Sequence, residues 1–78
     1  MARTDGMSIV GYVELVRRVV AWVATQEYYP TYGDIARRYH LNHAEIDDIC
    51  GDSDAYGPRL MAHEQNGPRS SVTVEVLD

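Results

Sequence analysis

The sequence contains one cysteine, no lysine and no uninterrupted apolar run long enough for a membrane span. A single thiol, Cys50, cannot form an internal disulfide, so we expect a protein of the reducing cytoplasm. The seven cations are all arginine, which suits bidentate contacts to phosphate or carboxylate, although the coding bias of a GC-rich genome explains this usage more simply. The longest apolar stretch, residues 10–24, is interrupted by Glu14, Arg17 and Arg18. We see no signal peptide and predict no membrane contact.

Motifs of enzymes and of metal sites are also missing. The chain has no glycine-rich phosphate loop and no nucleophile motif, and 78 residues leave little volume for a catalytic cleft. The metal-ligand types other than carboxylates are His40, His43, Cys50 and His63, whose spacing does not match a zinc signature. We therefore predict neither an enzyme nor a metal or cofactor site.

Charge is distributed unevenly along a chain whose formal net charge is −5. Residues 1–40 hold five arginines against four acids, whereas residues 41–78 hold two arginines against eight acids. This overall acidity argues against a protein that binds nucleic acid by bulk attraction alone.

Apolar periodicity predicts a first helix from Ser8 to about Gln26, after a flexible leader of residues 1–7. Its stripe recurs at three- and four-residue spacing; the members are Ile9, Tyr12, Val13, Val16, Val19, Val20 and Val23. Pro30 follows this helix. Thr31 then has the position of an N-cap, with Asp34 as the capping-box acid of a second helix. The buried side of that helix is predicted to hold Ile35, Ala36 and Tyr39.

A third helix is predicted after a tight corner at Leu41. Asn42 can cap it, and Ile46, Ile49 and Cys50 form one apolar face. Gly51 is expected to end it, which leaves residues 51–58 as a turn-rich connector. After residue 58 the apolar residues recur at every second position instead of every third or fourth. Val72, Val74 and Val76 alternate with other residues in this way, which predicts a half-buried strand. Residues 60–64 are the expected partner strand, and Asn66-Gly67 is a hairpin-turn signal between the two.

Three helices followed by a hairpin is the order of a winged helix-turn-helix, an α+β fold that we assign to residues 8–78 as one domain. The segment "YPTYGDIARRYHLNHAEID" resembles many small bacterial and phage regulators of this class, and Trp22, "DIA" and the hairpin are similar to enterobacterial activators of the CaiF/GrlA type. The resemblance implies a cytoplasmic transcription regulator that binds double-stranded DNA through helix two, the start of helix three and the wing. The residues implied in DNA contact are Thr31, Tyr32, Arg37, Arg38, Asn42, His43 and Arg69.

The third helix departs from this pattern because its exposed positions carry acids rather than donors to DNA. A single carboxylate can accept from a cytosine amine, but several facing phosphates would be repelled. The alternative is therefore an acidic protein-interaction module, such as a DNA-mimic-like inhibitor from a phage or mobile element, that binds a basic protein surface. Its contact residues would be Glu45, Asp47, Asp48 and Asp52.

Other residues of the chain have simpler interpretations. The pairs Arg17-Arg18 and Arg37-Arg38 are expected on solvated helix faces, and Tyr28 and Tyr29 are expected to pack over the end of the first helix. Tyr32 is the exposed aromatic expected at the start of the second helix. The first helix or the C-terminal strand could form a homodimer interface.

Overall fold

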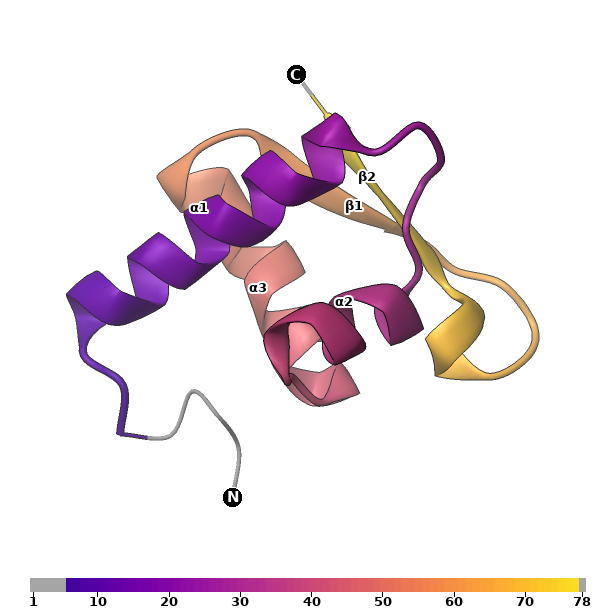
Figure 1. The fold of residues 1–78 in the computed structure, drawn as a ribbon, viewed down its shortest axis with the longest axis horizontal. Coiled ribbons are helices and arrows are strands. Elements are labelled where there is room, and N and C mark those ends of the chain that lie inside the picture. Colours follow the sequence, from indigo (N-terminus) through magenta and orange to yellow (C-terminus); the bar gives the residue numbers. More distant parts are fainter. Residues whose placement is uncertain (1–5, 78) are drawn as a thin grey trace.

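The computed structural model describes residues 6–77, so residues 1–5 of the predicted leader and Asp78 lie outside the described part. The described chain forms three helices and then a two-stranded antiparallel sheet (Figure 1). The predicted α+β class and order of elements are thus confirmed, and the layout is compatible with a winged helix. The elements are α1 (Ile9–Thr25), α2 (Tyr32–Tyr39), α3 (His43–Tyr56), β1 (Arg59–His63), a 3-10 turn (Arg69–Ser71) and β2 (Thr73–Leu77).

Helix α1 begins and ends within a residue of its predicted bounds. The Ser8 hydroxyl accepts a hydrogen bond from the backbone N–H of Gly11 at 3.0 Å and so caps the helix. The inward face is formed by Leu15, Val16, Val19, Val20 and Val23. Ile9 was predicted on this stripe and is instead 77% exposed, because the first turn of α1 projects beyond the elements that cover the rest of the helix (Figure 1).

Capping boxes start both of the following helices. At α2, Thr31 Oγ1 accepts from the N–H of Asp34 at 3.1 Å, and Asp34 Oδ2 accepts from the N–H of Thr31 at 3.0 Å. These bonds confirm the predicted box, and the bond from the Thr31 N–H holds the pKa of the Asp34 carboxyl below its usual range. At α3, Asn42 and Glu45 exchange the same pair of bonds, at 2.8 and 2.9 Å.

Helix α3 is longer than predicted. It continues through Gly51 to Tyr56 and is capped by Gly57, so the prediction of a turn-rich connector over residues 51–58 was wrong. The last turns of α3 are held by Ser53, which is completely buried. Its hydroxyl donates to the carbonyl of Cys50 and accepts from the N–H of Leu60, both at 2.8 Å. This side chain joins α3 to β1, a contact that the local turn-forming composition does not reveal.

Gly51 offers a simple test of the extended helix. It is exposed within α3, and a Cβ built on it meets no atom within 4 Å. Replacing Gly51 with alanine is therefore expected to raise the free energy of unfolding by about 0.5–1 kcal/mol, because alanine loses less backbone entropy in a helix. Urea denaturation would measure the change. Destabilisation would show that Gly51 ends the helix, as the sequence alone suggests.

The two strands pair Arg59 with Leu77 and His63 with Thr73 at the ends of the ladder. The connection is longer than a tight turn at Asn66-Gly67, because residues 64–72 form the loop and include the 3-10 turn. A short segment before α2 extends the sheet: the Val74 N–H donates to the Pro30 carbonyl, and the Tyr32 N–H donates to the Val72 carbonyl, both at 2.9 Å. Thr31 thus forms an isolated antiparallel β-bridge with Thr73 of β2.

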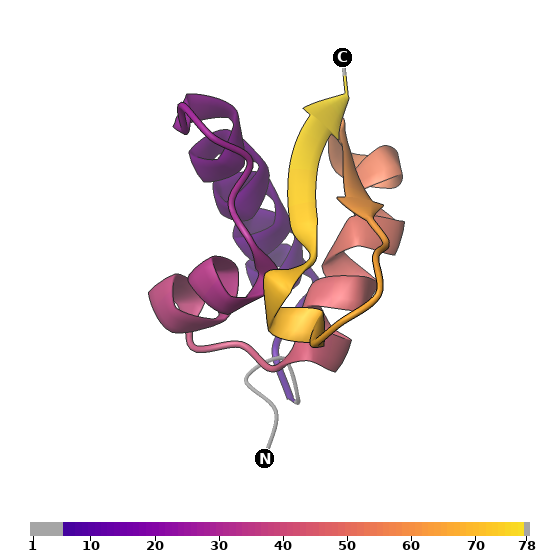
Figure 2. The same ribbon diagram turned by 90° about the vertical axis from the view of Figure 1, so that its right-hand side faces the viewer.

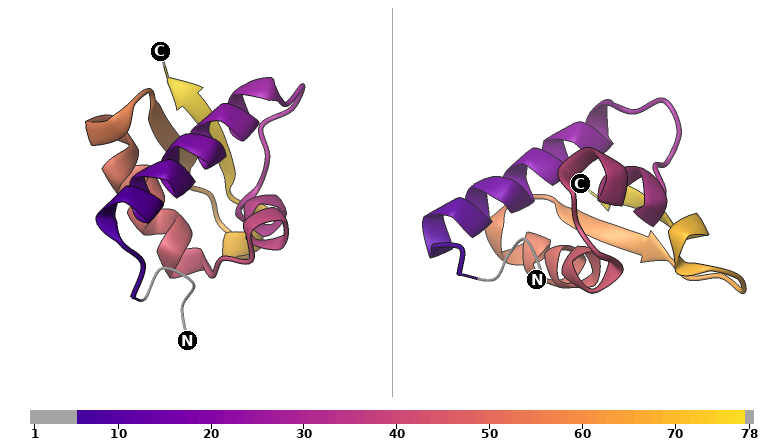
Figure 3. Two further views of the ribbon diagram at one scale, coloured as in Figure 1. Left: turned by 60° about the vertical axis from the view of Figure 1, so that its left-hand side comes forward. Right: turned by 60° about the horizontal axis from the view of Figure 1, so that its bottom comes forward.

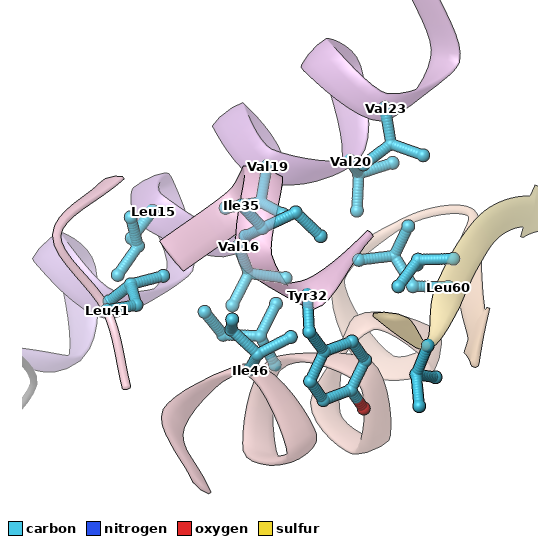
Figure 4. Close-up of a cluster of buried hydrophobic side chains, with 13 residues drawn as sticks. Leu15, Val16, Val19, Val20, Val23, Tyr32, Ile35, Leu41, Ile46 and Leu60 are labelled. Carbon is cyan, nitrogen blue, oxygen red and sulfur yellow. The ribbon is translucent and has the colours of Figure 1, made fainter. Parts of the chain in front are cut away.

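The strands stand between α1 and α3 when the molecule is seen from the side (Figure 2). The loop of residues 64–72 extends at the opposite end of the molecule from the start of α1 (Figure 3). Val72 and Val74 face inward, as the alternation predicted. The core lies where the three helices and the sheet meet (Figure 4), and it consists of Leu15, Val16, Val19, Val20, Val23, Tyr32, Ile35, Leu41, Ile46, Ile49, Leu60, Val72 and Val74.

Candidate interaction surface on helix α3 and the wing

Arg69 is the center of a charged cluster that joins the wing loop (residues 64–72) to α3. Its Nη2 lies 2.5 Å from Asp47 Oδ1, and its Nη1 lies 2.5 Å from Glu64 Oε2. The guanidinium also lies over the ring of Tyr32, with its carbon 4.8 Å from the ring centroid. The hydrogen bond to Glu64 and the nearby carboxylates raise the pKa of Arg69 above its ordinary value. The predicted phosphate-binding arginine of the wing is therefore neutralised by two carboxylates of its own chain.

Tyr32 lies beneath this cluster instead of in solvent. The prediction of an exposed aromatic was wrong: the side chain is only 1% exposed and belongs to the core. Its hydroxyl donates to Asp47 Oδ1 at 2.6 Å, and burial raises its pKa, so the group remains a hydrogen-bond donor. His43 contacts the Tyr32 ring edge to face. The ring is inward because the backbone of Tyr32 pairs with Val72, which draws the start of α2 against the sheet.

Glu45 was predicted on the exposed side of the third helix and is buried, with 4% of its surface exposed. Its carboxylate accepts from the Asn42 N–H, which explains how a charged group is tolerated there. Asn42 itself is exposed, but its amide oxygen serves the same cap. Glu45 therefore stabilises the start of α3 and cannot present its carboxylate to a partner.

The outward side of α3 nevertheless carries four exposed acids, with no arginine or lysine anywhere in the helix. We call this surface the acidic face; it comprises Asp47, Asp48, Asp52 and Asp54, together with the exposed small residues Ala44, Gly51 and Ala55. Asp52 accepts a hydrogen bond from the Tyr12 hydroxyl of α1 at 2.5 Å, and burial together with this carboxylate raises the pKa of Tyr12. Asp48 lies between the acids that contact the wing and α1.

The arginine pairs are exposed, as predicted. Arg37 Nη2 contacts Asp34 Oδ1 at 2.5 Å. The guanidinium carbon of Arg38 lies 5.2 Å from the ring centroid of Trp22 and 5.8 Å from that of Tyr39. Two of the three arginines predicted to contact DNA, Arg37 and Arg69, are thus paired with carboxylates of the same chain.

The sequence suggested that Tyr28 and Tyr29 pack over the end of α1, but the structure shows that they do not. They are 83% and 57% exposed. Pro30, the next residue, is buried instead, since its carbonyl pairs with β2. The tyrosines form part of a hollow that the sequence did not reveal; only their position beside Trp22 in the fold identifies it.

Metal-ligand side chains do not converge in the described part of the chain: residues 6–77 contain no group of three or more histidine, cysteine or acidic residues that could hold a metal ion. Within the same range, no helix is long and apolar enough to cross a membrane. Neither a protein-family profile, nor a curated protein, nor a solved structure matches this chain.

Proposed function

We propose that this protein is an interaction module that binds a basic surface of a partner protein through the acidic face of α3. The observation that supports this proposal is the pairing of Arg69 with two carboxylates. The wing cation that would otherwise offset the acids of α3 is already held by Asp47 and Glu64. The surface that a winged helix would present to DNA is therefore dominated by carboxylates.

Electrostatics favours a cationic partner over a DNA groove. Phosphates line the groove on both sides, and each carboxylate brought between them would pay for like-charge contact in a partly desolvated setting. Exposed Asp48 and Asp54 have no neighboring cation within α3 to offset that cost. Against a basic protein surface the same side chains would instead form charge-assisted hydrogen bonds.

The shape of the acidic face also supports a close protein contact. Ala44, Gly51 and Ala55 are exposed between the acids, so no large side chain keeps a partner away from the helix backbone. The partner class that fits is a protein with a phosphate-binding surface, such as a polymerase or nuclease, because an acidic helix can occupy a site built for phosphates. The protein would then act as an inhibitor that mimics DNA charge.

DNA binding in transcription regulation is a second candidate, supported by α2. Arg37 and Arg38 are both exposed near its C-terminal end, and such side chains could contact phosphates without inserting α3 into the groove. In this arrangement α2 would contact the DNA, whereas a usual winged helix inserts its third helix into the groove.

One binding experiment separates the two candidates. The labelled protein would be titrated with a short arginine-rich peptide and with a short mixed-sequence DNA duplex, at several salt concentrations. We expect peptide binding that weakens with salt, and about a ten-fold loss on replacing Asp48 with arginine. The matched control is Glu14→Arg, which reverses one exposed charge on α1.

Two results would contradict the first proposal. An equal loss for Asp48→Arg and Glu14→Arg would show that net charge, and not the acidic face, attracts the peptide. Duplex binding that depends on Arg37 and Arg38, with a steep salt dependence, would instead support the second candidate.

A further inference from the structure

A second surface of the molecule is a hollow between the end of α1, the segment of residues 26–30 and α2. Its volume is about 790 Å³, within the range of pockets that bind ligands. Its lining includes Trp22, Glu27, Tyr28, Tyr29, Arg37 and Arg38. We call this hollow the aromatic cleft. It shares no residue with the acidic face, and the loop that joins α1 to α2 forms part of its wall.

Tyr28 and Tyr29 of the cleft are exposed to solvent, and Trp22 is half-buried with one part packed against the core. Tyr28 is more than four-fifths exposed. The ring of Tyr29 is held by stacking on His63, with the centroids 5.6 Å apart and the planes at 14°. Trp22 is fixed edge to face against Tyr39 at 6.1 Å. Accessible tyrosine and tryptophan side chains beside arginine are typical of the residues that dominate binding energy at protein interfaces.

The charges of the cleft favour a ligand with few negative charges. Arg37 is paired with Asp34, whereas Arg38 has no carboxylate within ion-pair distance among residues 6–77. Arg38 is instead positioned over Trp22, which leaves its N–H donors available. Glu27 also lines the cleft. Among residues 6–77 the cleft thus presents one cation, Arg38, and one acid, Glu27, that form no ion pair, which suits a single carboxylate and opposes a polyphosphate chain.

From this arrangement we propose that the aromatic cleft binds an extended peptide segment of a partner protein that carries one acidic side chain next to apolar or proline residues. The carboxylate would accept hydrogen bonds from Arg38, and the neighbouring residues would pack on Trp22, Tyr28 and Tyr29. Aromatic-lined grooves recognise extended peptides in this way because such ligands are already ordered before binding. The proposal is independent of the function assigned to α3.

The test is selection from a random peptide library displayed on phage, followed by titration of the synthesised winners. Trp22 is the only tryptophan of the chain, so its fluorescence reports directly on the cleft. We expect enrichment of sequences with an acidic residue beside proline or an aliphatic residue, and a change in Trp22 emission on binding. Replacing Arg38 with glutamine should weaken binding about ten-fold.

Matched variants distinguish this site from net charge and from misfolding. Arg18→Gln removes one exposed arginine from α1, outside the cleft, and should leave affinity unchanged. Tyr28→Ala removes a solvent-exposed ring, so it should weaken binding while the circular dichroism spectrum stays the same. Glu27→Gln should strengthen binding, because it removes an acid near the ligand carboxylate.

Several outcomes would overturn the proposal. These are the absence of any enriched sequence, enrichment of basic sequences, and binding that is unchanged in both Arg38→Gln and Tyr28→Ala. Competition by a single-stranded oligonucleotide at the same site would assign the cleft to nucleic acid instead. Loss of binding in Asp48→Arg, with the cleft variants unaffected, would place the peptide on the acidic face.

Discussion

Replacing Tyr32 with alanine is expected to lower the free energy of unfolding by about 3–5 kcal/mol. The ring is buried among the side chains of α3 and the sheet (Figure 4), so its removal leaves a cavity that the backbone cannot close. Asp47 also loses the hydroxyl that donates to it. A domain of this size has a total stability of roughly 5 kcal/mol. We therefore expect this variant to be largely unfolded in urea concentrations that the unmodified protein withstands.

The matched variant Tyr32→Phe keeps the ring and removes only the hydroxyl. It should cost about 1 kcal/mol, the net value of one hydrogen bond. Urea denaturation followed by circular dichroism would measure both variants. An alanine variant as stable as the phenylalanine variant would show that Tyr32 lies at the surface, where the helix-turn-helix resemblance places it.

Replacing Ser53 with alanine is the second change with a large expected effect, a loss of about 1–3 kcal/mol. The hydroxyl of Ser53 satisfies the N–H of Leu60 at the edge of β1, and both residues are buried. Alanine would leave that N–H without its partner and inaccessible to water. The loss should appear as a lower denaturation midpoint with an unchanged slope, because the folded surface area is the same.

A control for this prediction is Ser70→Ala, since Ser70 is exposed in the 3-10 turn of the wing loop. It should change stability by no more than about 0.5 kcal/mol. Equal effects of the two serine variants would contradict the buried bond between α3 and β1. Native-state hydrogen exchange offers a second check, because the Leu60 amide should lose protection in Ser53→Ala only.

Buried Tyr32 also determines what the acidic face can do. Tyr32 holds Asp47 in place by a hydrogen bond, and Asp47 in turn holds Arg69. This chain of contacts neutralises the wing cation and leaves Asp48, Asp52 and Asp54 to set the charge of the surface. The proposed preference for a basic partner therefore depends on a tyrosine that contacts no partner itself.

Local signals in the sequence determined much of the secondary structure. The spacing of the valines in α1, the Thr31–Asp34 capping box and the alternation of Val72, Val74 and Val76 each predicted the observed element. These signals succeed because they act within one turn of helix or along one strand, where neighbouring residues decide the backbone conformation. The acidic character of the third helix was equally evident from composition.

The tertiary structure alone decided which of those residues are available for binding. It buries Tyr32 by pairing its backbone with Val72, extends α3 through Gly51 by the contact of Ser53 with Leu60, and neutralises Arg69 with Asp47 and Glu64. The Tyr32–Val72 and Asp47–Arg69 contacts join residues far apart in the chain, and the Ser53–Leu60 contact joins two different elements, so no helix or strand periodicity encodes them. Exposure and ion pairing depend on which segments meet in space, and for that reason the aromatic cleft, and the loss of Glu45 from the acidic face, emerge only from the folded chain.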